Sequence, residues 1–257
     1  MCLLFFSYRT TPGYELVVAA NRDEFLARST APLGYLDPEK TILGGRDQLC
    51  GGTWLGISAE MRFAAITNYR DPVANRPDAP SRGGILLEFL MGKKSPGKFL
   101  EILAQEASAF NGFNLIVGDS RELYYYTNRL HAPQLLAPGF YGLSNHLLDT
   151  PWPKVRRGKE LLRPHMVEAN PVDHLKLLEL LADRHQPPDN QLPTTGVGLA
   201  WERLLGTIFI NGSDYGTRSS AVITVTESGR IEFTEKTLHR EGEKDLRPEL
   251  VCLTFNT

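Results

Sequence analysis

The chain is poor in cysteine. Its 257 residues include three cysteines, Cys2, Cys50 and Cys252, and these lie far apart in the sequence. This number and spacing exclude a disulfide framework and a cysteine-bound zinc site. Scattered, unpaired cysteines are typical of a reducing compartment, so we expect a cytoplasmic protein.

Long hydrophobic runs and an excess of one charge are also absent. The first apolar stretch, Cys2 to Phe6, has about five residues and no basic leader, whereas a membrane span needs about 20 apolar residues. The 28 basic and 30 acidic residues give a net charge of −2 without a long run of either sign. Neither export, an integral membrane segment nor nucleic-acid binding is therefore expected. A small-molecule ligand suits this composition, and the sequence says nothing about oligomeric state.

Common metal and cofactor motifs are missing too. The six histidines form no HExxH or HxH pattern and have no cysteine at metal-ligand spacing, so no metal site is expected. Gly-x-Gly-x-x-Gly and Gly-x-Ser-x-Gly are absent, which removes the usual signals of dinucleotide-binding proteins and serine hydrolases. We therefore expect no cofactor.

The patterns that are present indicate strand hairpins combined with helices. Apolar alternation between turn residues predicts strands at 3–7, 15–20, 53–58, 62–68, 113–118, 122–127, 140–144, 207–211, 218–226 and 230–235. Helical periodicity predicts helices at 82–91, 96–107, 152–162 and 172–183. The segment 26–52, rich in Gly and Pro, is expected to be a long excursion at the surface or over a cleft. Hairpins that do not alternate with helices favour one α+β domain over residues 1–257, with helices packed on antiparallel sheets.

Cys2 directly follows the initiator methionine. A side chain this small normally lets methionine be removed, so we expect the mature chain to begin with Cys2. The α-amine would then have a pKa of about 7.7 to 8.0, close enough to neutral to accept the thiol proton. One residue would thus act as nucleophile and general base. The alternative is an ordinary buried thiol on the first strand, since free cysteine is among the most buried residue types.

A dense polar cluster, Asn21-Arg22-Asp23-Glu24, follows the second predicted strand. If the first hairpin pairs its two strands, this cluster lies beside Cys2, where a carboxylate can orient the α-ammonium and Arg22 can favour the thiolate. Strand alternation puts Arg22 and Glu24 on one face and Asn21 and Asp23 on the other. Which acid faces Cys2 then depends on where the strand ends. The alternative is a solvated strand end.

Later strand ends supply further candidates. Asn68 and Asn145 each end an apolar stretch, where an amide N–H can donate to the oxyanion formed when a thiolate attacks a carbonyl. Either amide could equally close a turn. Arg218, at the start of a strand, could hold a substrate carboxylate or lie on the surface. Trp54 follows a glycine-rich turn and is expected to pack beside it.

Six short segments together match a known pattern. They are Met1-Cys2, Asn21-Arg22-Asp23-Glu24, Gly51-Gly52-Thr53-Trp54-Leu55-Gly56, Thr67-Asn68-Tyr69-Arg70, Leu143-Ser144-Asn145 and Gly216-Thr217-Arg218-Ser219-Ser220. In these segments, which span nearly the whole chain, the sequence resembles the NRDE family, also called the transport and Golgi organization 2 family. That family is similar to N-terminal nucleophile hydrolases of the choloylglycine hydrolase and penicillin V acylase type, which implies a four-layer αββα sandwich.

The resemblance also implies roles for individual residues. It makes Cys2 the nucleophile and base, tuned and oriented by Arg22 and Asp23, served by Asn68 and Asn145 at the oxyanion or the amine, and supported by Arg218. In those hydrolases the acid follows the arginine after a short spacer, whereas here Asp23 is adjacent and Glu24 is next, so both acids stay open. Glu24, Trp54 and Tyr69 are the candidates for contacting substrate.

The expected activity is hydrolysis of a carbon–nitrogen bond in a linear amide, or of a related acyl bond, after removal of Met1. Cys2 would attack the carbonyl and form an acyl-thioester, which water would then hydrolyse. The alternative implied by the family resemblance is a non-catalytic protein on the same scaffold that handles an apolar ligand such as haem or lipid. A fold by itself does not decide between them.

Overall fold

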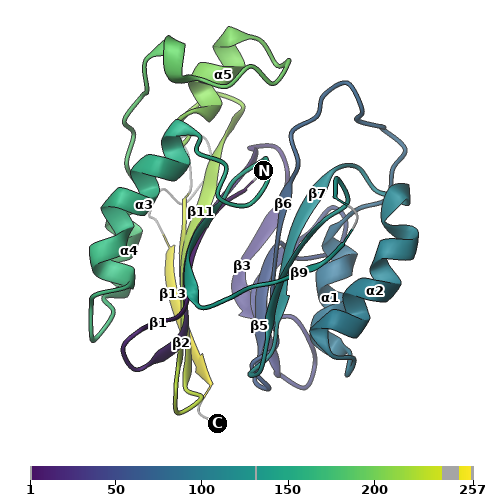
Figure 1. Cartoon of the computed structure of the whole chain (residues 1–257), viewed down its shortest axis with the longest axis vertical. Helices are drawn as coiled ribbons and strands as arrows, with labels where there is room; N and C mark the ends of the chain where they lie inside the picture. Colours follow the sequence, from purple (N-terminus) through teal and green to yellow (C-terminus); the bar gives the residue numbers. More distant parts are fainter. Residues whose placement is uncertain (1, 131, 239–248, 256–257) are drawn as a thin grey trace.

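Two antiparallel sheets form the centre of the molecule (Figure 1). The computed structural model describes residues 2–130, 132–238 and 249–255. Sheet A has the order β10-β1-β2-β11-β12-β13, made of β1 (Cys2–Thr11), β2 (Tyr14–Phe25), β10 (Gly139–Leu143), β11 (Tyr215–Thr226), β12 (Ile231–Thr237) and β13 (Glu249–Phe255). Sheet B has the order β3-β4-β5-β6-β7-β8-β9, made of β3 (Thr30–Tyr35), β4 (Ile42–Asp47), β5 (Leu55–Ser58), β6 (Phe63–Asn68), β7 (Phe113–Gly118), β8 (Leu123–Thr127) and β9 (Gln134–Leu135).

Helices cover the outer face of each sheet (Figure 1). The α-helices are α1 (Gly83–Met91) and α2 (Pro96–Glu106) on sheet B, α3 (Pro153–Met166) and α4 (His174–Leu180) on sheet A, and α5 (Leu199–Leu205). Short 3-10 turns lie at Ala107–Ala109 and Asp189–Gln191. The predicted α+β class and four-layer αββα sandwich are confirmed. Among the described residues, none of the helices has the length and hydropathy that a membrane crossing needs.

Strand β1 is buried on both faces. Leu4 and Phe6 point into the core between the sheets, whereas Leu3 and Phe5 point toward α3 and α4. A strand buried on both sides has no polar face, which explains why the chain opens on an unbroken apolar run. The first residue of this strand is Cys2, so the central packing also positions the predicted nucleophile.

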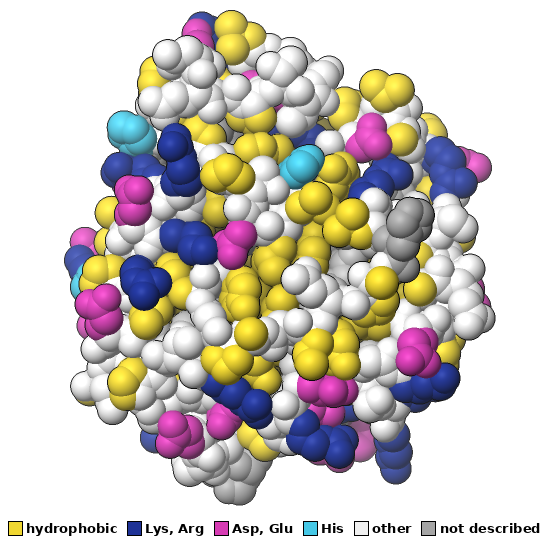
Figure 2. All heavy atoms as spheres, viewed as in Figure 1, with side chains coloured by type: hydrophobic (Ala, Val, Ile, Leu, Met, Phe, Trp, Pro, Cys, Tyr) yellow, Lys and Arg dark blue, Asp and Glu magenta, His cyan; other side chains and the backbone are white. Residues whose placement is uncertain are grey.

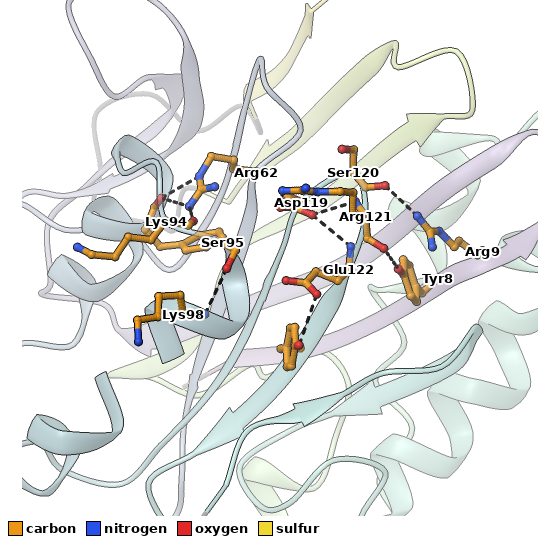
Figure 3. Close-up of polar contacts among 12 residues, drawn as sticks. Tyr8, Arg9, Arg62, Lys94, Ser95, Lys98, Asp119, Ser120, Arg121 and Glu122 are labelled. Atoms are coloured by element: carbon orange, nitrogen blue, oxygen red, sulfur yellow. Dashed lines mark hydrogen bonds and ion pairs between the residues drawn. The ribbon is translucent and has the colours of Figure 1, made fainter. Parts of the chain in front are cut away.

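Backbone carbonyl contacts join the two sheets at the end of the sandwich away from Cys2 (Figure 3). Arg9 Nη2 donates to the Ser120 carbonyl at 2.8 Å, and Tyr8 Oη donates to the Arg121 carbonyl at 3.5 Å. These contacts connect the β1–β2 hairpin of sheet A to the β7–β8 turn of sheet B. Because β1 runs from Cys2 toward this end, Cys2 lies at the opposite end of the sandwich.

The chain crosses from sheet B to sheet A between β9 and β10. On this face, hydrophobic side chains form a band along the middle of the molecule, with charged side chains around it (Figure 2). Leu136, within the crossing, is buried in the core between the sheets, while Leu135 just before it is exposed. The crossing therefore seals one side of the central core.

The segment 26–52 differs from the prediction. It forms β3 and β4 at the edge of sheet B, so the expected long excursion was wrong. The glycines that suggested a loop serve close packing: a Cβ on Gly44 would lie 2.7 Å from the Leu55 carbonyl oxygen, and one on Gly45 would lie 2.2 Å from Trp54 Cη2. Glycine here lets a neighbouring strand and an indole approach the backbone.

The last third of the chain differs in detail. The strand expected at 207–211 is wrong, because that segment forms only an isolated bridge between Asn211 and Gly216. The helix expected at 172–183 is shorter, and α5 and β13 were not expected. The other predicted helices and strands lie within a few residues of the observed ones.

Candidate active site

Cys2 and Arg22 are cross-strand partners in the β1–β2 pairing. Paired side chains point to the same face of a sheet. That face is the inner one, because their neighbours Leu4 and Ala20 belong to the core between the sheets. Burial raises the pKa of the half-buried Cys2 thiol, and the positive charges of the amino terminus and Arg22 oppose this rise.

Arg22 is a buried cation beside the thiol. Its guanidinium carbon lies 4.2 Å from the centre of the Trp54 ring, a cation–π distance. The side chain is 5% exposed, and Nη1 has no hydrogen-bond partner among the described residues. The contact with Trp54 therefore holds a positive charge on the side of the sheet where Cys2 lies.

Asp23 lies on the opposite face of β2. It accepts a hydrogen bond from Thr217 Oγ1 at 2.8 Å. Burial raises the pKa of its carboxyl, while Lys154 and the charge of the amino terminus act in the opposite direction. Asn21 shares this face and donates to the Leu181 and Ile208 carbonyls at 3.0 and 2.9 Å, so it anchors the segments outside sheet A.

A cavity of about 340 Å³ opens beside Cys2. This volume is in the range of small-molecule sites. Its walls come from the segment before α1 and from the end of both sheets at which Cys2 lies. They include Cys2, Arg22, Asp23, Glu24, Trp54, Asn68 and Arg82. Both acids of the cluster are among the lining residues. Glu24 lies on the same face of β2 as Arg22, whereas Asp23 lies on the opposite face, where it accepts from Thr217.

The two predicted asparagines have different surroundings. Asn68 ends β6 at the cavity, and its side chain makes no hydrogen bond within the described structure. Asn145 is buried, and its Nδ2 donates to the Asn68 carbonyl at 3.0 Å. The Asn145 carbonyl accepts from the Arg70 N–H at 2.7 Å. Asn68 is thus open to a ligand, while Asn145 holds the backbone that carries it.

Two other predicted residues lie away from the thiol. Arg218 sits where the β2–β11 register shifts, and its Nη1 donates to the Leu26 carbonyl at 2.8 Å. It is not among the residues that line the cavity of Cys2. Tyr69 lines a second cavity of about 300 Å³, which shares Glu24, Asn68 and Arg82 with the first. The two cavities therefore adjoin at Asn68.

Several charged residues at the site were not predicted, because they belong to no recognisable sequence motif. Arg28 and Asp47 form an ion pair at 2.6 Å in the cavity wall. Arg82, just before α1, lines both cavities and donates to the Gly112 carbonyl at 2.9 Å. Lys154, at the start of α3, is buried behind the sheet. The sequence shows none of these placements, because they depend on contacts between distant segments.

The described residues contain no group of three or more His, Cys, Asp and Glu side chains that could hold a metal ion. The cavity brings together the thiol of Cys2, the guanidinium of Arg22 and the side-chain amide of Asn68. The carboxylate of Asp23 lies on the opposite face of β2. This combination suits attack on a carbonyl carbon.

Comparisons with known proteins agree with the sequence pattern. A family model described as Transport and Golgi organisation 2 matches residues 1–240. A Transport and Golgi organization protein 2 homolog from Bos taurus is 38% identical, with 93% of each chain covered. The homolog from Homo sapiens is 34% identical, with 96% of this chain and 95% of that one covered.

Two solved structures are similar to this chain at much lower sequence identity. The C2A mutant of conjugated bile acid hydrolase from Clostridium perfringens aligns with 100% of this chain and 97% of its own, with a TM-score of 0.49 and 9% identity. A Caenorhabditis elegans N-acylethanolamine-hydrolyzing acid amidase ortholog aligns with 86% and 92%, with a TM-score of 0.45 and 14% identity.

Proposed function

This chain belongs to the Transport and Golgi organisation 2 family, and we propose that it is a cysteine amidohydrolase whose nucleophile is Cys2. The supporting observation is that the Cys2 thiol, the Arg22 guanidinium and the Asn68 amide meet at one cavity. These groups supply the nucleophile, a charge that favours the thiolate, and a donor for the oxyanion.

The reaction begins after Met1 has been removed. The α-amine of Cys2 takes the thiol proton, and the thiolate attacks the amide carbonyl. The oxyanion accepts a hydrogen bond from the Asn68 amide, and Asp23 orients the α-ammonium from the other face of β2. The ammonium then protonates the leaving amine as the carbon–nitrogen bond breaks. Water, deprotonated by the α-amine, hydrolyses the resulting thioester and releases the acid.

The two adjoining cavities suit a substrate that extends in two directions from its amide. Asn68 lies where they meet, so the reacting carbonyl would sit there, with one half beside Trp54 and the other beside Tyr69. Glu24 and Arg82 also lie at this junction. Asn145 and Arg218 then act through the backbone, since their hydrogen bonds go to the Asn68 and Leu26 carbonyls.

The alternative is a carrier of haem or lipid that keeps this scaffold without turnover. The cavity walls include Arg22, Glu24 and Arg82 as well as the Arg28–Asp47 ion pair. Charged walls suit a polar amide better than an apolar ligand. The cytoplasmic location stays a prediction from the sequence.

A variant comparison tests this proposal. Intact mass first establishes that Met1 is absent, and a panel of N-acyl amides and acyl thioesters is then assayed for hydrolysis. Cys2→Ala and Cys2→Ser should abolish turnover. Cys50→Ala is the matched control, because Cys50 lines the same cavity, and it should retain turnover.

The proposal is wrong if Cys2→Ala hydrolyses the panel as fast as the unmodified protein. It is also wrong if the purified chain retains Met1, or if Met1 is absent and none of the amides and thioesters is hydrolysed. The carrier alternative would gain from saturable binding of haem, seen as a Soret band, or of a fatty acid that Cys2→Ala leaves unchanged.

A further inference from the structure

A small inner pocket of about 10 Å³ lies between the two sheets, next to the cavity of Cys2. Cys2, Arg22 and Trp54 line both the cavity and this pocket. Its volume is roughly the space that one water molecule needs. The inner pocket therefore has room for a group about as large as a methyl group, directly beside the thiol.

Strand register explains the wall that sheet A gives to the inner pocket. Cys2 and Arg22 are cross-strand partners, and the next inward-facing pair of β1 and β2 is Leu4 with Ala20. Ala20 is paired in turn with Ala221 on β11. Two of these three residues, one step deeper than the thiol, are alanines. Their short side chains leave part of the space between the packed sheets unfilled.

Sheet B faces the same space with a third alanine. Ala65 on β6 is paired with Leu55 on β5, and both belong to the core between the sheets and line the inner pocket. Trp54, next to Leu55, packs against this core and stacks on Arg22. The inner pocket is thus bounded by both sheets, with the Arg22–Trp54 contact where it meets the larger cavity.

Large side chains limit the depth of the inner pocket. The next inward-facing residues of sheet A are Phe6, Val18 and Ile223, and Val18 is paired with both of the others. All three are 0% exposed. A core packed in this way resists added atoms, because extra volume forces side chains out of their preferred rotamers. A chain that extends beyond one residue step would have to displace these side chains.

The polarity of the site changes from the cavity to the inner pocket. Asn68 lines the cavity, and Arg22, whose Nη1 has no hydrogen-bond partner among the described residues, lines both spaces. Asn21, Thr67 and Ser219 also line the inner pocket, but their side chains form hydrogen bonds to other segments. An acyl group has the same polarity, because its carbonyl oxygen needs donors and its carbon chain needs apolar surroundings.

We propose that the inner pocket takes the acyl end of the substrate and restricts it to a short group, acetyl or at most propionyl. The inference rests on the proposed function, since it takes Cys2 as the nucleophile. The amine half then occupies the two larger cavities of about 340 and 300 Å³, whose charged side chains suit a polar group. Attack by the thiolate breaks the carbon–nitrogen bond, the amine leaves with the proton of the α-ammonium, and water releases acetate or propionate from the thioester.

Chloromethyl ketones of the form R–CO–CH₂–Cl test the inner pocket without turnover. The Cys2 thiolate displaces chloride and forms a thioether, while R takes the place of the acyl chain. Peptide mapping measures labelling for R from methyl to hexyl, with Cys50 as the internal reference because it lines the cavity but not the inner pocket. The ratio of Cys2 to Cys50 labelling should fall at least about tenfold between ethyl and hexyl.

A variant that enlarges the inner pocket should change this profile. Leu55→Ala removes part of its wall and should raise the relative labelling of Cys2 by the propyl and butyl reagents. Leu16→Ala is the matched control, because Leu16 is also in the core between the sheets but pairs with Tyr8, away from Cys2. It should leave the profile unchanged. If Leu55→Ala does not fold, Leu55→Val replaces it with a smaller gain, and the parent chain decides by itself.

Labelling of Cys2 that does not decline with chain length in the parent chain overturns the inference. An equal change of profile in Leu16→Ala and Leu55→Ala also overturns it, because the effect would then not come from the inner pocket. A steep decline with chain length, without hydrolysis of any amide, would support the inner pocket and contradict the proposed function. A Cys2 that reacts with none of the reagents would overturn both.

Discussion

Arg22 and Asp23 are adjacent in the sequence, but their side chains lie on opposite faces of β2. Arg22 stacks on Trp54 in the space between the sheets, and Asp23 accepts from Thr217 on the outer face. Cys2, the first residue of β1, is the cross-strand partner of Arg22. The guanidinium of Arg22 therefore lies on the same face of the sheet as the Cys2 thiol, and the Asp23 carboxylate lies on the opposite face.

This arrangement predicts that Arg22→Met slows alkylation of Cys2. Loss of the nearby cation raises the thiol pKa, so the thiolate fraction at pH 7 should fall at least about tenfold. Brief iodoacetamide treatment followed by peptide mapping measures the rate, with Cys252 as the internal reference. Arg22→Lys keeps the charge and should retain more of the reactivity. Equal rates for Met and Lys at this position would rule out an electrostatic role.

Asn68→Ala should lower kcat by about 10²- to 10³-fold, since the oxyanion loses a donor. Stability should change little, because the Asn68 side chain makes no hydrogen bond within the described structure. Asn145→Ala should instead lower the free energy of unfolding by roughly 1 to 3 kcal/mol, because it removes the buried bond to the Asn68 carbonyl. Kinetics and thermal unfolding of both variants provide the check. A loss of stability in Asn68→Ala together with a loss of kcat alone in Asn145→Ala would mean that Asn145 is the oxyanion donor and Asn68 the structural residue.

Gly45→Ala should destabilise the site by about 1 to 3 kcal/mol, because the new Cβ would lie 2.2 Å from Trp54 Cη2 and push the indole away from Arg22. Gly84→Ala is the matched control, since nothing lies within 4 Å of its Cβ position. It is at the start of α1 and should be neutral or slightly stabilising. Thermal unfolding and tryptophan fluorescence distinguish the two, and similar values for both would show that the indole has room to move.

The Arg70–Glu202 pair should behave as a buried ion pair. Glu202→Gln keeps an acceptor for the Thr195 N–H but leaves Arg70 unbalanced, so it should cost about 3 to 5 kcal/mol. Adding Arg70→Met should recover part of this loss. A double-mutant cycle by denaturant unfolding measures the coupling, and strictly additive losses would contradict a direct interaction.

Glu235→Gln should raise the melting temperature near pH 7. Burial raises the pKa of Glu235, so the folded state prefers the protonated form. The stabilisation by that proton is fully present below the unfolded pKa and is lost as pH rises through the folded pKa. Gln imitates the protonated acid and can still accept from the Leu33 N–H, so the advantage of the variant should shrink as pH falls toward 4. A variant that is less stable at neutral pH would show that the charge itself is needed.

Local sequence patterns were enough to place the first elements of the site. Pro12 and Gly13 form the turn between β1 and β2, with Gly13 at φ +80°, a conformation that favours glycine. This turn lies between the two apolar strands predicted at 3–7 and 15–20, so the sequence predicts that Arg22 lies near Cys2. Alternation along β2 then separates Arg22 from Asp23. These relationships depend on neighbours in the chain, which a sequence displays directly.

Other parts of the site could not be predicted in this way. Strand alternation separates two faces without telling which one lies between the sheets, so Asp23 and Glu24 could not be assigned before the structure. The glycines of β4 resemble loop residues until Trp54 and Leu55 are packed on them. Arg82 and Lys154 carry no local signal at all.

The sequence by itself determined the first hairpin, the pairing that brings Cys2 beside its polar cluster and, through the six matching segments, the family. Only the tertiary structure decided that Asn68 opens on the cavity, that Asn145 and Arg218 bind backbone carbonyls, and that Lys154 is buried at the start of α3. The physical reason is that turns and alternation act over a few residues. Burial and charge balance arise between segments that meet only when both sheets and their helices pack together.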